Sequence, residues 1–239
     1  MAAVVSSVLC SVFVVVSSTM CGRFNLVSYP DQLSETIGIP ITAPVVPRYN
    51  IAPSQPIAAV RLASNRRQSE LTHFAWGFLP VWSDDPTRYY INARLETAGE
   101  KPSFRDAFKR RRCLIPATGF YEWKKTPQGK KPFHIYPRDR KVFLMAGIWG
   151  YWSAPDGTEV QTAAILTEPA KGFMKQIHNR MPVILPKPQW QRWLSTPAIP
   201  PHDTWSEFAA IEVSSLVNKP TNTGPDCIES VENPLSYQA

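Results

Sequence analysis

Proline restricts the fold of this chain more than any other feature: 24 of its 239 residues are proline. Because proline lacks a backbone N–H and breaks helix interiors, a bundle of long helices is excluded. Between the prolines lie short runs rich in β-branched and aromatic residues, and turn formers bound them. These runs predict strands at 57–63, 70–76, 112–118, 132–137, 142–152 and 160–167. Short helices are predicted at 30–37, 103–109 (capped by Ser103), 170–177 and 188–194.

The pattern predicts an α+β fold, a single β-rich domain with short helices between antiparallel strands. With 44% hydrophobic and 19% charged residues, the chain is not a disordered polyelectrolyte. No internal repeat and no long polar linker divides it. We expect three segments: an apolar leader or mis-assigned start at 1–19, one domain at 20–218, and a loop-like tail at 219–239.

Several chemistries have no support in the sequence. Four cysteines, Cys10, Cys21, Cys113 and Cys227, lie far apart, so neither a disulfide framework nor a metal site is expected. No phosphate-binding glycine loop, HExxH motif or GxSxG motif occurs, so we expect no cofactor, no metal and no serine-hydrolase activity. A formal net charge of +7 is compatible with an anionic partner such as nucleic acid. The tryptophans at 149, 152, 190 and 193 are expected to pack in the core or against helices.

Residues 2–19 are uncharged and apolar, with serine interspersed. A signal peptide would need a basic start and a cleavage motif, and both are missing. A membrane anchor is marginal at this length and serine content, and a first strand would alternate with period two. We therefore favour a leader that is removed, or translation that starts at Met20.

Either event would make Cys21 the N-terminal residue once the methionine is removed. The α-amine and thiol of Cys21 would then form a 1,2-aminothiol, which an interior cysteine cannot offer. Such a group attacks an aldehyde through nitrogen and closes through sulfur to a thiazolidine. The amine is partly neutral near pH 7, and the thiol is partly ionised.

Six sequence blocks occur in a fixed order: MCGRF (20–24), RYNIAPSQ (48–55), WGFLPVW (76–82), INARLET (91–97), CLIPATGFYEW (113–123) and IHNRMPVI (177–184). Taken together after MCGRF, they resemble the SOS response-associated peptidase (SRAP) family over residues 20–218, nearly the whole chain. The resemblance implies a single β-rich domain that binds single-stranded DNA. It also implies that the N-terminal cysteine links covalently to the aldehyde of an abasic site, and the family name records a proposed self-cleavage of a leader.

The resemblance assigns the catalytic positions to Cys21, Asn92, Glu122 and His178. The chemistry needs these residue types. A carboxylate can carry protons to and from the amine and the sugar ring, and a histidine can relay them. An asparagine can hold the amine as donor or acceptor. Taken alone, His178 and Asn92 would more often be structural residues.

The DNA-binding positions that follow from the same blocks share basic, aromatic or pocket-lining character. Arginines fork onto phosphate oxygens, and aromatic residues within 76–82 could stack on bases or wedge between them. Further basic runs occur at 109–112, 124–131 and 138–141, although 124–131 also fits a plain hairpin turn. The predicted DNA-binding residues are Arg23, Arg48, Pro53, Trp76, Arg94, Thr167 and Arg180.

Three functions compete. The first is a crosslinker that shields abasic sites in single-stranded DNA during the DNA damage response, with lyase-like chemistry and possible autoproteolysis. The second is a cysteine peptidase that uses Cys21 and His178 on other proteins. The third is a non-covalent single-stranded DNA binder. We favour the first, in a monomer without a stable membrane partner. We expect it in the cytoplasm, associated with the nucleoid if bacterial, and not exported by the leader.

Overall fold

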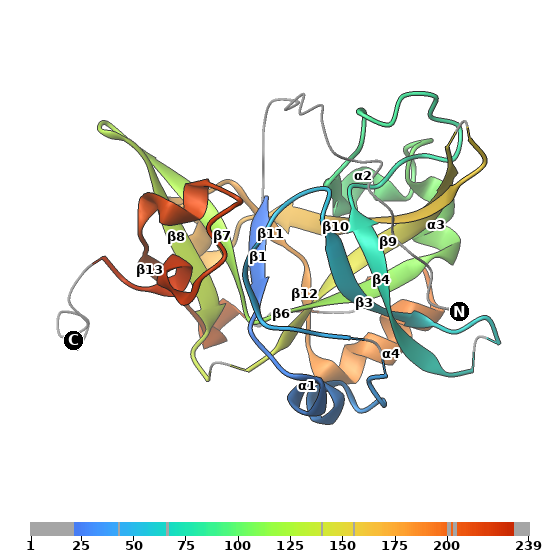
Figure 1. The fold of residues 1–239 in the computed structure, drawn as a ribbon, viewed down its shortest axis with the longest axis horizontal. Helices are drawn as coiled ribbons and strands as arrows, with labels where there is room; N and C mark the ends of the chain where they lie inside the picture. The colour runs from blue at the N-terminus through green and yellow to red at the C-terminus, as the bar shows by residue number, and fades with distance from the viewer. Residues whose placement is uncertain are drawn as a thin grey trace.

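Two β-sheets face each other in the computed structural model, which describes residues 22–42, 44–65, 67–139, 141–154, 156–199, 202 and 205–231. The first sheet is antiparallel and has the strand order β13-β8-β7-β1-β2 (Figure 1). Its strands are β1 Arg23–Leu26, β2 Arg48–Ile51, β7 Gly119–Thr126, β8 Gly129–Pro137 and β13 Phe208–Glu212.

The second sheet follows the order β11-β10-β4-β3-β6-β9-β12, and β9 also pairs with β10, so the central strands close on themselves. Strand β10 runs antiparallel to β9 and β11 but parallel to β4 and β5. The bounds are β3 Pro56–Leu62, β4 Ser69–Trp76, β5 Asn92–Arg94, β6 Arg112–Ala117, β9 Phe143–Ser153, β10 Glu159–Pro169, β11 Arg180–Pro182 and β12 Ile184–Leu185.

The main core lies between the two sheets and takes apolar side chains from both. Phe24 of β1 meets Trp76 of β4 edge to face, with ring centroids 5.1 Å apart. Phe74 stacks on Trp149 within the second sheet at 5.2 Å. A second cluster packs α3 and α4 onto the outer face of the second sheet. Buried aromatic residues therefore fix the strands that carry the site.

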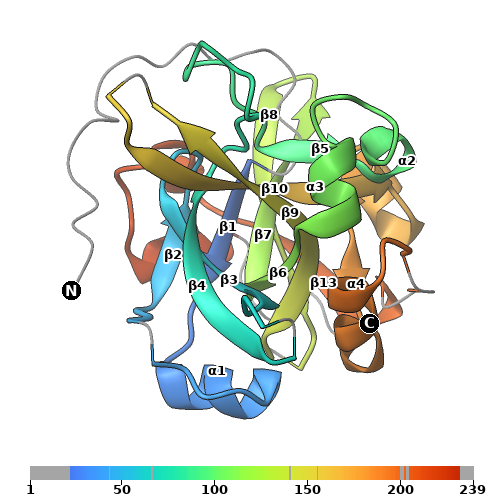
Figure 2. The ribbon, with the colours of Figure 1, turned by 90° about the vertical axis from the view of Figure 1, so that its right-hand side faces the viewer.

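Helices are short and lie around the sheets (Figure 2). The α-helices are α1 Pro30–Ile37, α2 Leu95–Ala98, α3 Arg105–Arg110 and α4 Trp190–Ser195. Helix α1 begins with proline, which is preorganised for a first turn, and ends at Gly38 with φ of +80°. The 3₁₀ helices are η1 Gly172–Gln176, η2 Lys187–Gln189, η3 Trp205–Glu207, η4 Ser215–Asn218 and η5 Pro225–Ile228.

The predicted fold class is confirmed, with the two parallel pairings of β10 as an addition. All six predicted strands are present within about two residues at most ends, and the 124–131 segment forms the β7–β8 hairpin turn. The expected Ser103 cap is wrong, because α3 begins after Phe104 and has no side-chain cap. The predicted helix at 170–177 is a 3₁₀ helix, since it covers little more than one turn.

Three of the four tryptophans that were expected to pack in the core or against helices are buried. Trp149, Trp152 and Trp193 are buried, and Cys113 and Cys227 are buried free thiols. In the predicted tail, η5 packs Cys227 against Tyr121 and Val217. The leader at 1–19, Cys21 and residues 232–239 lie outside the described residues. No helix in the described ranges has the length and apolar character that a membrane span requires.

Candidate active site

Strand β1 brings the start of the described chain against β7. Its register pairs Arg23 with Tyr121 and Phe24 with Phe120. If this antiparallel ladder continued by one position beyond β1, Gly22 would come opposite Glu122. Cys21, the predicted nucleophile, immediately precedes Gly22 in the sequence and is not among the described residues. The site is therefore built around the neighbours of Cys21.

Glu122 is a buried carboxyl group on β7, with 1% of its surface exposed. The strand is covered on both faces here, because every residue from Gly119 to Glu122 is buried. Glu122 interacts with other parts of the described chain. This burial excludes the solvent-facing strand position that its place between Tyr121 and Trp123 would also allow.

Asn92 enters from the second sheet. It is the first residue of β5 and lies beside Ile165 of β10 in a parallel pairing. The preceding residue, Ile91, is fixed because its carbonyl accepts a hydrogen bond from the Trp76 indole at 2.9 Å. Asn92 is half-buried and has polar interactions of its own. A fully buried tryptophan therefore holds the start of β5 in place.

His178 lies just before β11 and is half-buried. Its Nδ1 is 3.2 Å from the backbone N of Arg180, which can donate to it, and 3.3 Å from the Arg180 carbonyl oxygen. Partial burial lowers the pKa of His178; the backbone contact opposes this, and the positive charges of Lys125 and Lys130 add to the lowering. Those lysines pair across the β7–β8 hairpin. The positive charges that act on His178 therefore belong to this hairpin, whose strand β7 also contains Glu122.

Replacing both hairpin lysines should make His178 easier to protonate. Burial and two nearby cations disfavour the imidazolium, so the histidine stays neutral to a lower pH than usual. In Lys125→Ala/Lys130→Ala the pKa of His178 is expected to rise, and any step that needs neutral His178 should fail at a higher pH. An NMR titration of the His178 ring measures this directly. Lys175→Ala, an exposed lysine near His178 in sequence, is the control; an unchanged titration in the double variant would contradict the assignment.

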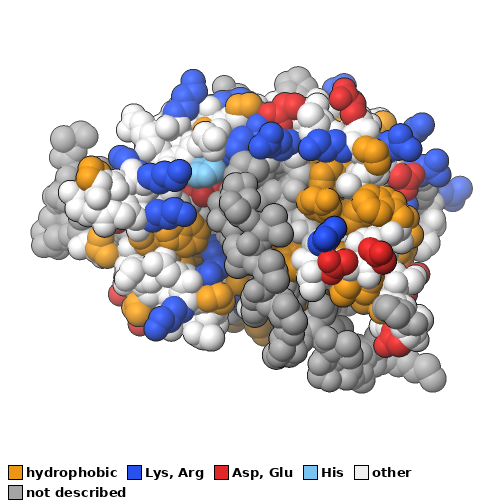
Figure 3. All heavy atoms as spheres, turned by 90° about the horizontal axis from the view of Figure 1, so that it is seen from above, with side chains coloured by type: hydrophobic (Ala, Val, Ile, Leu, Met, Phe, Trp, Pro, Cys, Tyr) orange, Lys and Arg blue, Asp and Glu red, His pale blue; other side chains and the backbone are white. Residues whose placement is uncertain are grey.

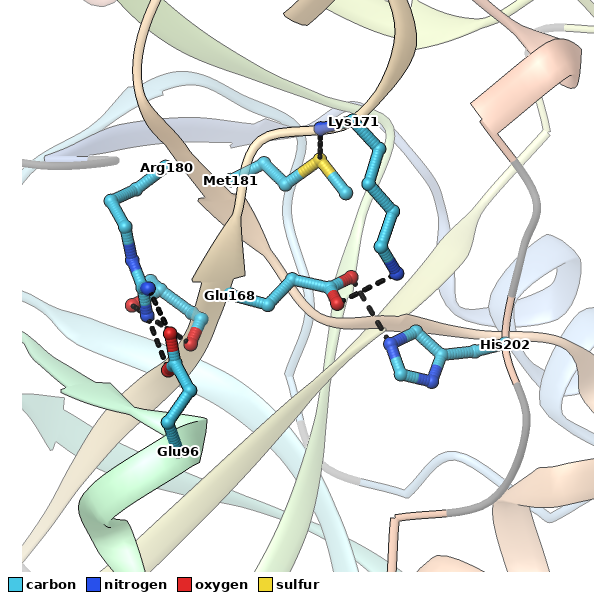
Figure 4. Close-up of polar contacts among 7 residues, drawn as sticks. Glu96, Glu168, Lys171, Arg180, Met181 and His202 are labelled. Atoms are coloured by element: carbon cyan, nitrogen blue, oxygen red, sulfur yellow. Dashed lines mark hydrogen bonds and ion pairs between the residues drawn. The ribbon is translucent and has the colours of Figure 1, made fainter. Parts of the chain in front are cut away.

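Arg180, a buried residue, forms an ion pair with the exposed Glu96 that joins β11 to α2 (Figure 4). Its guanidinium forks onto both carboxylate oxygens of Glu96, with Nη2 at 2.8 Å from Oε2, and also donates to the Thr167 carbonyl at 2.7 Å. The hydrogen bonds from Arg180 hold the pKa of Glu96 below its usual value. Arg180 and Thr167 are both buried. The structure thus places these two predicted DNA-binding residues behind the site surface.

A second carboxylate with charged or polar partners, Glu168, lies on the other side of the same strands in Figure 4. Glu168 contacts Lys171 at 2.8 Å and His202 at 3.1 Å. Burial alone would raise the pKa of Glu168, but hydrogen bonds from His202 and Lys171 outweigh it and hold the pKa below its usual value. The contact with Glu168 links His202 to β10.

Arg23 ties the start of β1 to the C-terminal segment. Its Nη1 donates to Asn50 Oδ1 at 2.9 Å and to the Val217 carbonyl at 2.6 Å. Asn50 is itself buried and donates to the carbonyls of Val217, Lys219 and Asn222. These hydrogen bonds occupy donors of Arg23 and fix the position of this residue, which lies two residues after Cys21.

The remaining predicted DNA-binding residues differ in exposure. Arg48 donates to the Pro56 carbonyl at 2.6 Å and to Gln55, and Pro53 is half-buried. Trp76 is fully buried, so its ring faces the core. Arg94 is exposed. Among these four, Arg94 is the one whose charge is open to a ligand.

Most of the chain matches a family model. The model for the SOS response associated peptidase (SRAP) family covers residues 20–220. The chain belongs to the SRAP family. Curated relatives include Abasic site processing protein YoqW of Bacillus subtilis, 40% identical over 88% of this chain and 100% of the relative. Abasic site processing protein YedK of Escherichia coli is 33% identical over 73% of this chain and 79% of its own. Abasic site processing protein HMCES of Gallus gallus is 30% identical over 78% of this chain and 67% of its own.

Solved structures share the SRAP fold seen here. A crystal structure of a Bacteroides thetaiotaomicron protein matches with a TM-score of 0.78 and 24% identity, over 89% of this chain and 100% of that chain. A phage-related protein of Bordetella bronchiseptica matches with a TM-score of 0.63 and 28% identity, over 81% and 94%. These similarities place the two sheets and the site strands within one common architecture.

The face around the SRAP site is basic and partly apolar. The β7–β8 hairpin and α2 lie at the upper end of Figure 1, and Figure 3 looks down on that end. Lysine and arginine side chains gather there beside a group of hydrophobic side chains. The 77–91 segment contributes Val81 and Trp82, which are 73% and 64% exposed. Within the described ranges, no group of His, Cys, Asp and Glu is arranged to hold a metal ion.

Two site features were missed at the level of single residues. Sequence reasoning named the 76–82 block but chose Trp76, whereas Trp82 is the exposed aromatic residue. The period-two pattern of β4 could have signalled a buried Trp76 at the strand end. The other missed residue is Asn50, which binds the C-terminal segment, and no local signal reveals so distant a partner.

Gly77, with φ of +148°, allows the Tyr89 ring to lie close to the backbone at the start of the 77–91 segment. A Cβ at this position would lie 2.6 Å from the Tyr89 ring.

Proposed function

We propose that this chain processes abasic sites in DNA, and that Cys21, once N-terminal, links to the lesion as a thiazolidine. The relatives support the substrate, since proteins up to 40% identical are named abasic site processing proteins. One structural observation carries the rest of the proposal. Arg23 pairs with Tyr121, the residue before the buried Glu122, and consecutive Cα atoms are only about 3.8 Å apart. In the proposal, this pairing would bring the amine of Cys21 near the Glu122 carboxyl group.

The proposed reaction balances with the release of one water. The neutral amine of Cys21 attacks the aldehyde carbon of the ring-opened sugar and gives a carbinolamine. Protonation of its hydroxyl group releases water and leaves an imine. The thiolate of Cys21 then attacks the imine carbon, the C=N electron pair moves to nitrogen, and nitrogen takes up a proton. No oxidant, metal or cofactor is needed.

The three residues around this centre take distinct parts in the proposal. Glu122 accepts a proton from the attacking amine and delivers one to the leaving hydroxyl group. His178 is held neutral by its surroundings and acts at the sugar, as the acceptor of the hydroxyl proton when the ring opens. Asn92, at the start of β5, orients the amine by hydrogen bonding.

The proposed partner is DNA that is single-stranded around the lesion. The exposed ring of Trp82 can stack on an unpaired base, a contact worth about 1–3 kcal/mol. The exposed Arg94 and the hairpin lysines Lys125 and Lys130 can hold phosphates on either side. One Cys21 and one strand suffice, so we propose a monomer. In a bacterium, its DNA substrate would place it in the cytoplasm.

The free amine of Cys21 requires that residues 1–20 be absent. Translation from Met20 followed by removal of that methionine would suffice. Alternatively, the Cys21 thiol could attack the preceding carbonyl, and hydrolysis of the resulting thioester would release the leader. The second route would make self-cleavage an activity of the same cysteine.

A denaturing gel tests the proposal. Protein that starts at Met20 is mixed with single-stranded DNA that contains one abasic site. We expect a shifted band that survives denaturation, that Cys21→Ala abolishes, and that Cys113→Ala, a change at a buried thiol, preserves. The 239-residue form crosslinks only if its leader is removed.

Other outcomes of the same experiment identify the competing functions. Wild-type protein that binds the DNA but gives no shifted band would contradict the proposal and leave a non-covalent binder. Turnover of peptides without DNA, lost in Cys21→Ala and His178→Ala, would instead establish a cysteine peptidase.

A further inference from the structure

Helix α3 carries a cluster of cations that neither the fold nor the proposed active site uses. Arg105, Lys109 and Arg110 are exposed on this helix. The acid within it, Asp106, is engaged by Arg110 at 3.1 Å and by Arg111 at 2.5 Å. Arg105 and Lys109 form no ion pair with the described residues. Two full positive charges therefore remain uncompensated on a six-residue helix.

Helix stability does not account for this cluster. Cations at the end of a helix interact favourably with its dipole, which explains Lys109 and Arg110 in the last turn. Arg105 is in the first turn, where a cation is unfavourable. Its position therefore favours an external anion over a role in the helix.

These side chains line an open cleft. The cleft has a volume of about 610 Å³ and lies among Arg105, Lys109, Arg110, Gly99 and Pro197. Arg110 also borders a smaller cleft of about 180 Å³ that contains Arg61 and Tyr151. Tyr151 is 37% exposed and can offer a ring edge to a base. Basic side chains next to an exposed aromatic ring fit a nucleic-acid strand better than a small anion.

The cleft lies within reach of the proposed active site. Helix α2 separates the two: it follows Arg94 and ends before Gly99, and Glu96 within it holds Arg180. Figures 1 and 2 both show α2 and α3 side by side. A helix rises about 1.5 Å per residue, so the five steps from Arg94 to Gly99 advance about 7.5 Å.

We propose that the α3 cleft binds the phosphodiester backbone of the DNA that flanks the lesion, outside the proposed active site. This inference rests on the proposed function for the presence of a lesion at the site, but binding to α3 needs no covalent step. Arginine and lysine contacts with phosphates hold DNA without reading its sequence. The cleft would thus set how much flanking DNA the protein requires.

Binding measured against DNA length tests the inference. Fluorescence anisotropy compares Arg105→Ala/Lys109→Ala with wild type on a 7-nucleotide strand, a 25-nucleotide strand and a 25-nucleotide strand with one duplex flank. We expect about tenfold weaker binding to the long DNAs and no change for the 7-mer. The slope of log K against log salt should fall by about 1.4 for single strands or 1.8 for duplex, the value for two phosphate contacts. A loss confined to one long DNA identifies which flank the cleft holds.

A matched variant separates local binding from net charge. Arg138 and Lys141 are exposed and follow the C-terminal end of strand β8. Arg138→Ala/Lys141→Ala removes these two charges and should bind all DNAs like wild type. Equal losses on the 7-mer and the long strands, or no loss on any, would overturn the inference. Failure of the proposed function would look different: wild type would form no covalent band, while the length-dependent binding would persist.

Discussion

Replacing Glu122 by glutamine is expected to slow crosslinking to an abasic site by about 10²- to 10⁴-fold, the usual contribution of a positioned general acid or base. Glutamine keeps the size and much of the hydrogen bonding of the buried side chain but cannot carry a proton. Both the attack by the amine and the loss of water lose their proton carrier. Single-turnover formation of the covalent band, followed over time, measures the rate.

The controls for Glu122 must separate chemistry from folding. Glu159→Gln changes an exposed carboxylate at the start of β10 and should leave the rate unchanged. Equal melting temperatures for wild type and Glu122→Gln would show that the buried strand tolerates the amide. A Glu122→Gln rate within about threefold of wild type would exclude proton transfer by this residue.

The strands that the sequence predicts are those whose pattern is local. Each of the six predicted strands is a run of β-branched and aromatic residues between turn formers. Strands β1, β2 and β5 have only three or four residues each, too few for a recognisable alternation. Their conformation depends on partners far along the chain, such as β7 for β1 and β10 for β5. Local propensity contains no information about such pairings.

The candidate site was predictable in its residue types but not in their exposure. The order of the motif blocks predicts roles for Asn92, Glu122 and His178, which stay predictions, and chemistry explains why those residue types suit them. Neither the motif order nor the chemistry distinguishes an arginine that contacts phosphate from one that stabilises the fold. Arg180 is buried and pairs with Glu96, which lies 84 residues away in the sequence. Trp76 is buried by the same kind of distant packing.

The basic run at 109–112 shows this ambiguity most clearly. In the sequence it is one patch of four cations, and either a solvated face or a DNA contact explains it. In the structure, Lys109 and Arg110 are exposed, whereas Arg112 is buried with 3% of its surface exposed. The change occurs where α3 ends and β6 begins, so neighbouring residues point to different environments.

Arg112 joins the ends of two helices through backbone carbonyls. Its Nε donates to Trp193 at 2.7 Å, and its Nη2 donates to Leu194 at 3.0 Å, both in α4. Its Nη1 donates to Phe108 at 3.0 Å and Lys109 at 2.5 Å, both in α3. Helix C-termini leave carbonyls without intrahelical partners, and one guanidinium here satisfies those of both helices. Its charge also complements the negative ends of the two helix dipoles.

Arg112→Met is therefore expected to lower the free energy of unfolding by about 3–5 kcal/mol, since each buried carbonyl left without a donor costs about 1–3 kcal/mol. The gain from no longer burying a charge offsets part of the total. In a chain of this length, that loss corresponds to a drop in melting temperature of about 6–20 °C. Calorimetry or thermal circular dichroism measures it.

Two further variants decide whether geometry or charge is responsible. Arg112→Lys keeps the charge but cannot fork onto carbonyls of both helices, so most of the loss should remain. Arg110→Met removes an exposed neighbour from the same run and should change the stability by less than about 1 kcal/mol, the usual limit for a surface ion pair. Equal, small effects of Arg112→Met and Arg110→Met would mean that the run is a solvated surface throughout. A large effect of Arg112→Met alone would show that a single basic run combines a structural arginine with exposed cations that the fold does not require.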